Sequence, residues 1–310
     1  MSNALAPNPG APHSGASNLG PRYPGTPCPV DTSTVSHYSG APYSVVLPVY
    51  AGDEAAWFAT SLQSVLDQTQ PSDDVIVVVN GAIPEPLAAL VSRFTEQYPQ
   101  VGALHLAQNL GTGAARNHGI RATKHELVAV QDADDVSLPN RMALLTEALL
   151  GDADLVMVGG QIGEFAGDDP LEITSYRRVP TSAAEVEHFA HKRMPVNGPT
   201  LMFRKTPVLA VGGYGEGTRS EDYLLIARLL ASGAKINNIP EVVLHYRAGP
   251  EALARRRTWN HFRGFVATRI QVKRLGIGSW LDVAIPCAAQ LALTITPQRV
   301  TELFYKKVLR

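Results

Sequence analysis

The chain has 310 residues, 45% of them hydrophobic and 18% charged, enough to bury a sizeable core in one large domain with appendages. Its two cysteines, Cys28 and Cys287, match no metal-binding or redox spacing, which excludes a disulfide framework. Residues 251–310 carry eleven Lys or Arg against three Asp or Glu, a net charge of +8. Because the whole chain has a net charge of −1, residues 1–250 carry −9. This basic tail favours an anionic partner such as lipid headgroups. We expect no nucleic-acid partner.

Residues 1–42 are rich in Pro, Gly, Ser, Ala and Asn and predict a disordered leader, because they offer too little apolar surface to offset chain entropy. No basic stretch followed by an apolar core marks a secretion signal. The most apolar run, 281–296, contains Asp282, Pro286 and Gln290 and falls short of the ~18 apolar residues of a membrane-spanning helix. We therefore expect a cytoplasmic protein whose basic tail can contact the inner face of the membrane peripherally.

Strands and helices alternate in the first half of the chain. The patterns predict strands at 44–50, 74–80, 101–106 and 126–131, and helices at 54–68, 86–98, 112–123 and 140–150. Such alternation is typical of right-handed βαβ units on a parallel sheet. In open sheets of this kind, ligands bind beyond the carboxyl ends of the strands. The loops after Val49, Val79 and Gln131 are therefore expected to share one edge of the sheet.

The second half is more mixed. Strands are predicted at 155–162, 200–204 and 241–247, a helix at 221–232, and further helices within 250–310 that carry the basic charge. Together the two halves predict an α/β protein with a mostly parallel sheet flanked by helices and a helical C-terminal extension.

The strand at 126–131 runs directly into three acids, Asp132, Asp134 and Asp135. Carboxylates gathered at the end of a buried strand repel one another and raise each other's pKa. A hard divalent cation relieves that repulsion; Mg²⁺ or Mn²⁺ takes one or two carboxylates and completes its shell with substrate phosphates and water. The alternative is a solvated acidic turn that caps the next helix, which Asp135 could do alone. The strand-end position favours a metal–diphosphate site.

A series of motifs follows between Tyr43 and Arg247. In chain order they read LPVYAGDE (47–54), LQSVLDQT (62–69), VVVNGA (77–82), NLGTGAARNHGI (109–120), DADDVSLPNR (132–141), VGGY (211–214), EDYLLIARLLASGAK (221–235) and NIPEVVLHYR (238–247). In this order and spacing they resemble the motifs of family 2 glycosyltransferases of the GT-A fold. The resemblance implies a Rossmann-like GT-A domain over residues 43–247. Its nucleotide-binding half would span residues 43–150 and its acceptor half residues 151–247. Residues 248–310 would form a basic, amphipathic helical extension.

The same resemblance implies an inverting, metal-dependent enzyme that moves a sugar from a nucleotide-diphosphate sugar to a glycan or lipid-linked acceptor, as in bacterial surface polysaccharide or glycolipid assembly. Asp222 matches the general base that takes the proton of the acceptor hydroxyl. Asp134 matches the direct ligand of Mg²⁺ or Mn²⁺ on the diphosphate, and Asp132 the carboxylate beside it that faces the ribose or the sugar. The implied nucleotide-sugar site comprises Pro48, Val49, Tyr50, Asn80, Asp132, Ala133 and Asp134.

Several positions leave alternatives open. Asn80 stands where most family members have an Asp against the base, so the base preference is not implied. Arg116 either reaches the diphosphate or ties the sheet edge to a buried carboxylate, and its place inside a helix favours the structural role. Asn197, Glu221 and His245 are candidates for contact with the acceptor or the diphosphate. Without the resemblance, Glu221 and Asp222 would be read as acids that complement the dipole of a helix capped by Ser220.

Three other functions fit the sequence less well. A dinucleotide oxidoreductase is excluded, because Arg116 replaces the third glycine of the phosphate loop and the motif follows the third strand instead of the first. A nucleotidyltransferase would carry a basic, Gly-rich loop after its first strand, whereas LPVYAGDE has no basic residue. A catalytically silent nucleotide-sugar-binding or scaffold protein stays open. The presence of Asp132, Asp134 and Asp222 argues against it.

Overall fold

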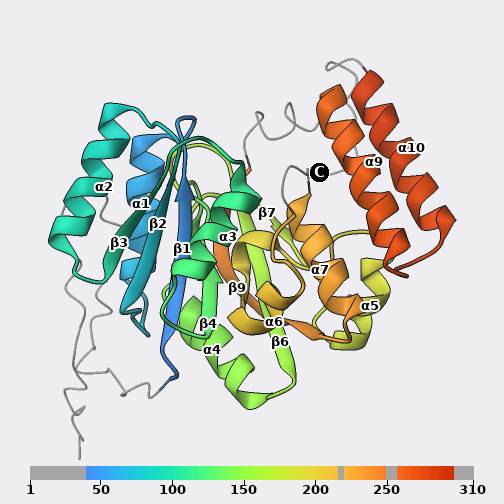
Figure 1. The fold of residues 1–310 in the computed structure, drawn as a ribbon, viewed down its shortest axis with the longest axis horizontal. Coiled ribbons are helices and arrows are strands. Elements are labelled where there is room, and N and C mark those ends of the chain that lie inside the picture. Colours follow the sequence, from blue (N-terminus) through green and yellow to red (C-terminus); the bar gives the residue numbers. More distant parts are fainter. Residues whose placement is uncertain (1–39, 216–219, 249–256, 297–310) are drawn as a thin grey trace, which may run out of the picture. The chain divides into compact units, whose positions relative to one another are not determined.

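The computed structural model describes residues 40–215, 220–248 and 257–296. All of them belong to one unit of the chain, Tyr38–Arg310. The predicted leader lies outside the described residues except for residues 40–42, and the domain boundaries at 42, 150 and 247 stay predictions. Every strand and helix predicted between residues 43 and 150 is confirmed to within a few residues (Figure 1). In chain order they are β1 (Tyr43–Val49), α1 (Ala55–Leu66), β2 (Asp74–Asn80), α2 (Glu85–Gln97), β3 (Val101–Leu106), α3 (Thr112–Ala122), β4 (Leu127–Val130) and α4 (Arg141–Gly151).

The remaining elements include several that the patterns did not predict. They are β5 (Val136–Ser137), β6 (Leu155–Phe165), β7 (Ile173–Arg177), α5 (Ala183–Ala190), a 3₁₀ turn (Gly198–Thr200), β8 (Met202–Arg204), α6 (Lys205–Ala210), α7 (Glu221–Ala231), β9 (Lys235–Arg247), α9 (Trp259–Arg274) and α10 (Trp280–Ile295). Of these, β5, β7, α5 and α6 were missed. The strand β5 has only two residues, and β7 is a largely exposed edge strand without an apolar alternation.

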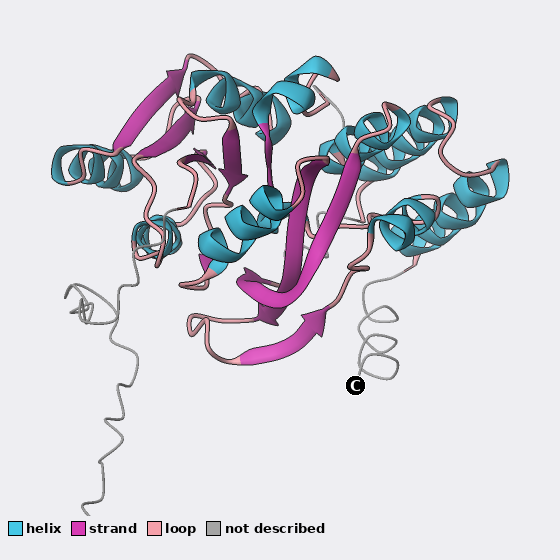
Figure 2. Cartoon of the chain, turned by 90° about the horizontal axis from the view of Figure 1, so that it is seen from below, coloured by secondary structure: helices cyan, strands magenta, loops and turns pink. Residues whose placement is uncertain are grey.

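The strands form one sheet in the order β3-β2-β1-β4-β8-β6-β9-β5, with β7 beside β6. The first four of these strands are parallel, β8 is antiparallel to its neighbours β4 and β6, and β6 and β9 are parallel again. Figure 2 shows the helices packed around these strands. The predicted α/β fold with a mostly parallel sheet is confirmed.

Two apolar clusters fill the space on either side of the sheet. Because side chains alternate along a strand, Val45 and Leu47 of β1 face a cluster with α1, α2 and α4, while Val46 faces a cluster with α3, α6 and α7. Gly119 explains how closely α3 lies on β1, since a Cβ there would come within 2.4 Å of Val46 Cγ1. The tight packing fixes α3, whose first turns reach the carboxyl edge of the sheet.

The C-terminal helices α9 and α10 pack on each other, and α9 packs on α7 (Figure 1). The buried Arg269 of α9 fastens this pair to the domain. Its Nη1 donates to Tyr223 Oη over 3.1 Å, and its Nη2 to the Lys192 carbonyl over 2.6 Å. The predicted helical extension is confirmed for residues 259–295, while 249–256 and 297–310 lie outside the described residues. None of the described helices is long and apolar enough to span a bilayer.

Candidate active site

The strand ends that the sequence places together do meet at one edge. Val49 and Val79 are register partners at the ends of β1 and β2, and Val130 of β4 pairs with Val46 of β1. Beyond β4, Ser61 of α1 donates its hydroxyl to the Asp132 carbonyl over 2.6 Å. The loop that begins at Asp132 is therefore held at the carboxyl edge of the sheet.

One guanidinium links the two carboxylates on which the sequence analysis centred. Arg116 of α3 is 3% exposed; its Nη2 pairs with Asp132 Oδ1, and its Nη1 lies 2.8 Å from Asp222 Oδ1. The side chains of Asp132 and Asp222 are 28% and 29% exposed, so both carboxylates stay open to a ligand. Arg116 was expected to pair with a buried carboxylate. Instead it pairs with two partly exposed carboxylates, Asp132 and Asp222, that belong to the site itself.

Tyr214 and Asn117 hold Arg116 in this position. The Arg116 guanidinium lies over the Tyr214 ring at 5.2 Å, a favourable cation–π arrangement. Asn117, the next residue of α3, donates to the Tyr214 carbonyl over 2.9 Å and accepts from the Tyr214 amide over 2.8 Å. The VGGY segment is thereby tied to α3. The VGGY motif alone predicted no role for Tyr214.

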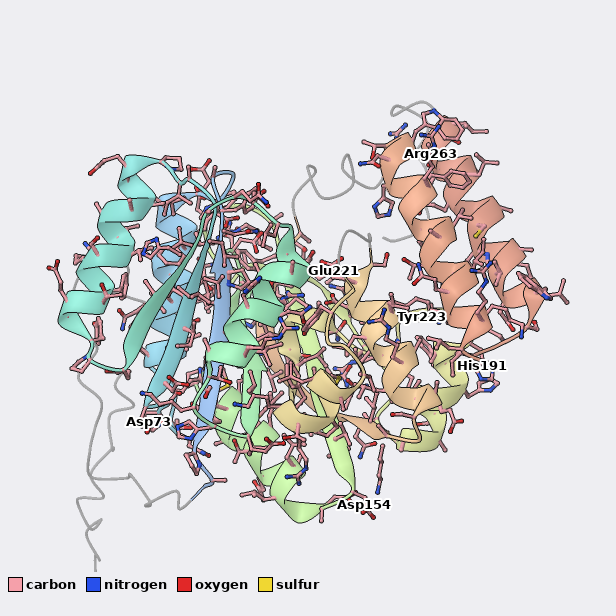
Figure 3. All side chains as sticks on the ribbon, viewed as in Figure 1. Asp73, Asp154, His191, Glu221, Tyr223 and Arg263 are labelled. Carbon is pink, nitrogen blue, oxygen red and sulfur yellow. The ribbon has the colours of Figure 1, made fainter. Side chains whose placement is uncertain are left out.

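Asp222 lies at the start of α7 in an environment that disfavours its charge. Burial raises its pKa, and the nearby Asp132 adds to the rise, while Arg116 opposes it. Gly198, in the loop before β8, packs closely against this carboxylate, since a Cβ there would fall 2.5 Å from Asp222 Oδ2. Glu221 and Asp222 do lie in the first turn of α7, where acids complement the helix dipole, but Ser220, with a φ of 67°, makes no side-chain capping bond there. Figure 3 shows the neighbouring Glu221 where α7 begins, beside α3.

Glu221 gives a test of these electrostatics. Burial and then the charge of Asp222 raise its pKa from 4.5 to about 6, so the folded state binds the proton more tightly than the unfolded state. Ionisation of Glu221 therefore lowers the free energy of unfolding as the pH rises from about 4.5 through 6. We expect Glu221→Gln, which carries no titrating charge, to raise the free energy of unfolding above pH 7 and not below pH 4.5. Urea unfolding at both pH values measures this, with the exposed Glu187→Gln of α5 as control. An equal effect of Glu221→Gln at both pH values would contradict the assignment.

Asp135 has a structural place. It is fully buried and accepts from the Arg247 amide over 3.0 Å, which ties the end of β9 to the end of β4. The Arg247 side chain donates from Nε to the Asp134 carbonyl over 3.2 Å and stacks on the rings of Trp57 and Phe165 at 4.1 and 4.6 Å. Asp135 therefore anchors a strand, which differs from the helix-capping alternative. Burial, with the neighbouring Asp134 and Asp132, raises its pKa well above the usual range.

Arg141, the last residue of DADDVSLPNR, holds the end of β4 through hydrogen bonds. It is fully buried and donates from Nη2 to the carbonyls of Val130 and Pro199, over 2.7 and 2.8 Å, and from Nη1 to Gln131 Oε1 over 2.6 Å. The end of β4 is thereby joined to the loop whose Gly198 lies against Asp222. No such role was predicted for Arg141, which is the first residue of α4 and ends the DADDVSLPNR motif.

The acids after β4 suit a cation that is shared with a substrate and not one that is held by protein side chains alone. Across residues 40–215, 220–248 and 257–296, no three His, Cys, Asp or Glu side chains are placed to hold an ion by themselves. Asp134 is half-buried beyond the end of β4, and the charge of Asp132 is balanced by Arg116. This sparse donor set suits Mg²⁺ or Mn²⁺ held by one or two carboxylates and completed by substrate phosphates.

The residues expected along the nucleotide differ in exposure. Pro48 and Val49 end β1, and Tyr50 is 38% exposed, with its amide donating to Asp53. Asn80 is buried; its Nδ2 donates to Asn109 over 3.1 Å, and its Oδ1 accepts from the Leu110 amide over 2.9 Å. The amide of Asn80 thus shapes the loop that leads into α3. Ala133 is buried between Asp132 and Asp134.

The two more distant candidates lie as follows. Asn197 is 2% exposed and donates to the carbonyls of Gly160 and Arg177, so its side chain points toward β6 while the next residue, Gly198, borders Asp222. His245 pairs with Val136 where β9 meets β5, and burial lowers its pKa. The contact of Asn197 and His245 with the acceptor or the diphosphate stays a prediction.

Comparisons with known proteins agree with this geometry. The family model described as glycosyl transferase family 2 matches residues 44–208. A Haemophilus influenzae protein named as an uncharacterized glycosyltransferase is 30% identical, over 86% of this chain and 99% of its own length. The Erwinia amylovora amylovoran biosynthesis glycosyltransferase AmsE is 28% identical, over 86% and 98%. An Escherichia coli UDP-Gal:alpha-D-GlcNAc-diphosphoundecaprenol beta-1,3-galactosyltransferase is 27% identical, over 86% and 96%.

Solved structures show the same fold. The mannosyltransferase PcManGT from Pyrobaculum calidifontis, in complex with GDP-Man and Mn²⁺, superposes with a TM-score of 0.59 at 19% identity, over 87% of this chain and 82% of that one. Residues 1–349 of S. aureus TarS in complex with UDP-GlcNAc superpose with a TM-score of 0.57 at 15% identity, over 86% and 76%. At these identities the likeness concerns the fold, which is the GT-A arrangement.

Proposed function

The chain belongs to glycosyl transferase family 2, and we propose that it is an inverting, metal-dependent enzyme that moves a sugar from a nucleotide-diphosphate sugar to an acceptor hydroxyl. The observation that carries the proposal is the pairing of Asp132 and Asp222 across the Arg116 guanidinium. It supports a site in which a donor-binding carboxylate and a proton acceptor lie within the reach of one arginine, at the edge of the sheet where ligands bind.

In the proposed reaction Asp222 takes the proton of the acceptor hydroxyl while that oxygen attacks the anomeric carbon. The new carbon–oxygen bond forms on the face opposite the bond to the diphosphate, which breaks, so the configuration inverts. Burial makes Asp222 a stronger base by raising its pKa, and Arg116 keeps the rise in check. This balance suits a group that must be ionised before the reaction and protonated after it.

Asp134 and Asp132 are the residues proposed to hold Mg²⁺ or Mn²⁺. A cation bound there would supply positive charge where the departing diphosphate gains negative charge. Pro48, Val49, Tyr50 and Asn80 are proposed to lie along the nucleotide, and Asn197, Glu221 and His245 stay candidates for the acceptor or diphosphate side.

The acceptor is proposed to be a glycan or a lipid-linked sugar, in the assembly of a bacterial surface polysaccharide or glycolipid. The name of the Escherichia coli relative, which specifies a diphosphoundecaprenol-linked acceptor, supports this class, as does AmsE by its role in amylovoran biosynthesis. A lipid-linked acceptor would place the enzyme in peripheral contact with an anionic membrane surface.

A donor screen tests the proposed function. The full chain is incubated with UDP-, GDP- and dTDP-sugars, each with Mn²⁺, with Mg²⁺ or with a chelator, and nucleotide release is measured. We expect one nucleotide to support release that requires the cation. Binding of a donor by calorimetry without turnover on any acceptor would favour the silent, nucleotide-sugar-binding alternative. Absence of binding to every donor would overturn the assignment of Asp132 and Asp134.

A further inference from the structure

Helix α10 presents an apolar face that nothing among the described residues covers. Trp280, Leu281, Ile285 and Ile295 are 63%, 70%, 67% and 64% exposed, and no residue of the helix is fully buried. Every exposed residue of α10 is apolar: Trp280, Leu281, Ala284, Ile285, Ala288, Ala289, Leu291, Ala292 and Ile295. At about 100° per residue, the large side chains among them cover an arc of roughly 140°. So wide a face is more than the scattered exposed apolar residues of an ordinary surface.

Basic residues gather where α9 passes into α10. Arg274 ends α9 and is exposed, and Gly278, just before α10, lies against the His191 carbonyl. The exposed Lys192 and Arg193 follow His191, which Figure 3 shows beside this end of the helix pair. The apolar face and this basic cluster (Lys192, Arg193, Arg274) thus adjoin, with Asp282 engaged in capping α10 through Ser279.

We propose that the exposed face of α10 docks on an anionic lipid bilayer, with Trp280, Leu281 and Ile285 among the acyl chains and the basic cluster at the headgroup phosphates. Helices of this type lie in the plane of the interface with the apolar face some 5–10 Å deep. Each Lys or Arg near an anionic surface adds to the attraction. The aromatic ring of Trp280, at the end of the face next to the basic cluster, suits the boundary between acyl chains and headgroups.

Charge favours a bilayer over a second copy of the chain. Residues 251–310 carry eleven Lys or Arg against three acids, so two copies meeting through this segment would bring like charges together. An anionic surface complements the same charge. The helix also offers no exposed polar side chain for specific contacts with a protein partner.

The docked helix would lie close to the proposed catalytic base. Arg269 of α9, against which α10 packs, donates to Tyr223, and Tyr223 directly follows Asp222 on α7. A bilayer bound to α10 is therefore joined to the acceptor side of the site by packed helices. This arrangement suits an acceptor whose lipid stays in the membrane while its sugar reaches Asp222. The inference rests on the proposed lipid-linked acceptor, which it deepens.

Co-sedimentation with vesicles tests the proposal. The full chain is mixed, without any sugar donor, with phosphatidylcholine vesicles that contain or lack phosphatidylglycerol. We expect binding that requires the anionic lipid and weakens with salt, and a blue shift of tryptophan emission. The double variant Leu281→Ser/Ile285→Ser should lower the binding constant by about tenfold or more, because two large apolar side chains no longer leave water. The control Leu150→Ser changes a 53% exposed leucine on α4 and should bind as the wild type does.

Three results would overturn the proposal. The wild type could fail to bind anionic vesicles, or the double variant could bind them as well as Leu150→Ser does. Light scattering could instead show a wild-type dimer that the double variant abolishes, which would assign the face to a second copy. Because no donor is present, each result leaves the donor screen, and with it the proposed catalysis, unaffected.

Discussion

Replacing Asp222 by Asn is expected to lower kcat for sugar transfer by about 10²–10⁴-fold, the usual contribution of a general base. Asn keeps the shape of the side chain and can still accept from Arg116 Nη1, but it cannot take the proton of the acceptor hydroxyl. Donor binding by calorimetry should change little, since the acceptor, not the nucleotide, loses its partner. The wild-type rate should also fall as the pH drops below the raised pKa of Asp222, because the protonated carboxyl cannot act as a base.

Two further variants make that result specific. Asp73→Asn alters an exposed acid just before β2, at the opposite end of the sheet from Glu221 in Figure 3, and should leave transfer unchanged. Glu221→Gln separates the two neighbouring acids of α7. If Glu221→Gln abolished transfer while Asp222→Asn retained it, the base would be Glu221. Its pKa of about 6 would make that assignment chemically reasonable.

The parallel part of the fold was open to prediction because its signals are local. A run of buried β-branched residues such as that at 74–80, with amphipathic helices on either side, is typical of a buried parallel strand. The strands β5 and β7 lacked such signals. Two residues of β5 are held by β9 from more than a hundred positions away along the chain, and that contact is set by the tertiary fold, not by the segment itself.

The active-site grouping was predictable only in part. That Asp132 and Asp134 lie at the carboxyl edge follows from the strand before them. That Asp222 lies at the same edge does not follow from any local pattern, and only the family resemblance suggested it. Arg116 shows the limit most clearly, since its sequence position favoured an ion pair but could not say with which acids. The partners come from the loop after β4 and from the first turn of α7, which α3 meets only after folding.

The basic extension is a similar case. Its charge was plain from composition, but the sequence could not show which face of residues 280–295 would be covered by α9. The structure leaves the large apolar side chains outward, with Asp282 turned to its capping bond with Ser279. Composition predicted the contact of this segment with an anionic membrane surface, but which side chains form the exposed apolar face follows from how the two helices pack.

Replacing Asp134 by Asn is expected to lower metal-dependent transfer on the order of 10³-fold, because the cation's contribution to a developing charge amounts to several kcal/mol and each 1.36 kcal/mol is tenfold. Asn keeps an oxygen that can approach a cation but loses the charge that holds it. The concentration of Mn²⁺ needed for half-maximal rate should therefore rise, and saturating Mn²⁺ should restore part of the activity. Chelation of the cation should lower transfer by the wild type to the level of the Asp134→Asn variant.

Asp135→Asn is the matched control, since it makes the same change one residue away. The raised pKa of Asp135 means that its side chain is favoured in the neutral form, and an Asn oxygen can still accept from the Arg247 amide. Its Mn²⁺ dependence should therefore match that of the wild type. If Asp135→Asn raised the Mn²⁺ requirement and Asp134→Asn did not, the cation would be bound by the buried Asp135. The hydrogen bond from the Arg247 amide to Asp135 would then have to break whenever the donor binds. The two variants thus distinguish a cation held at the open edge of the sheet from one held beneath it.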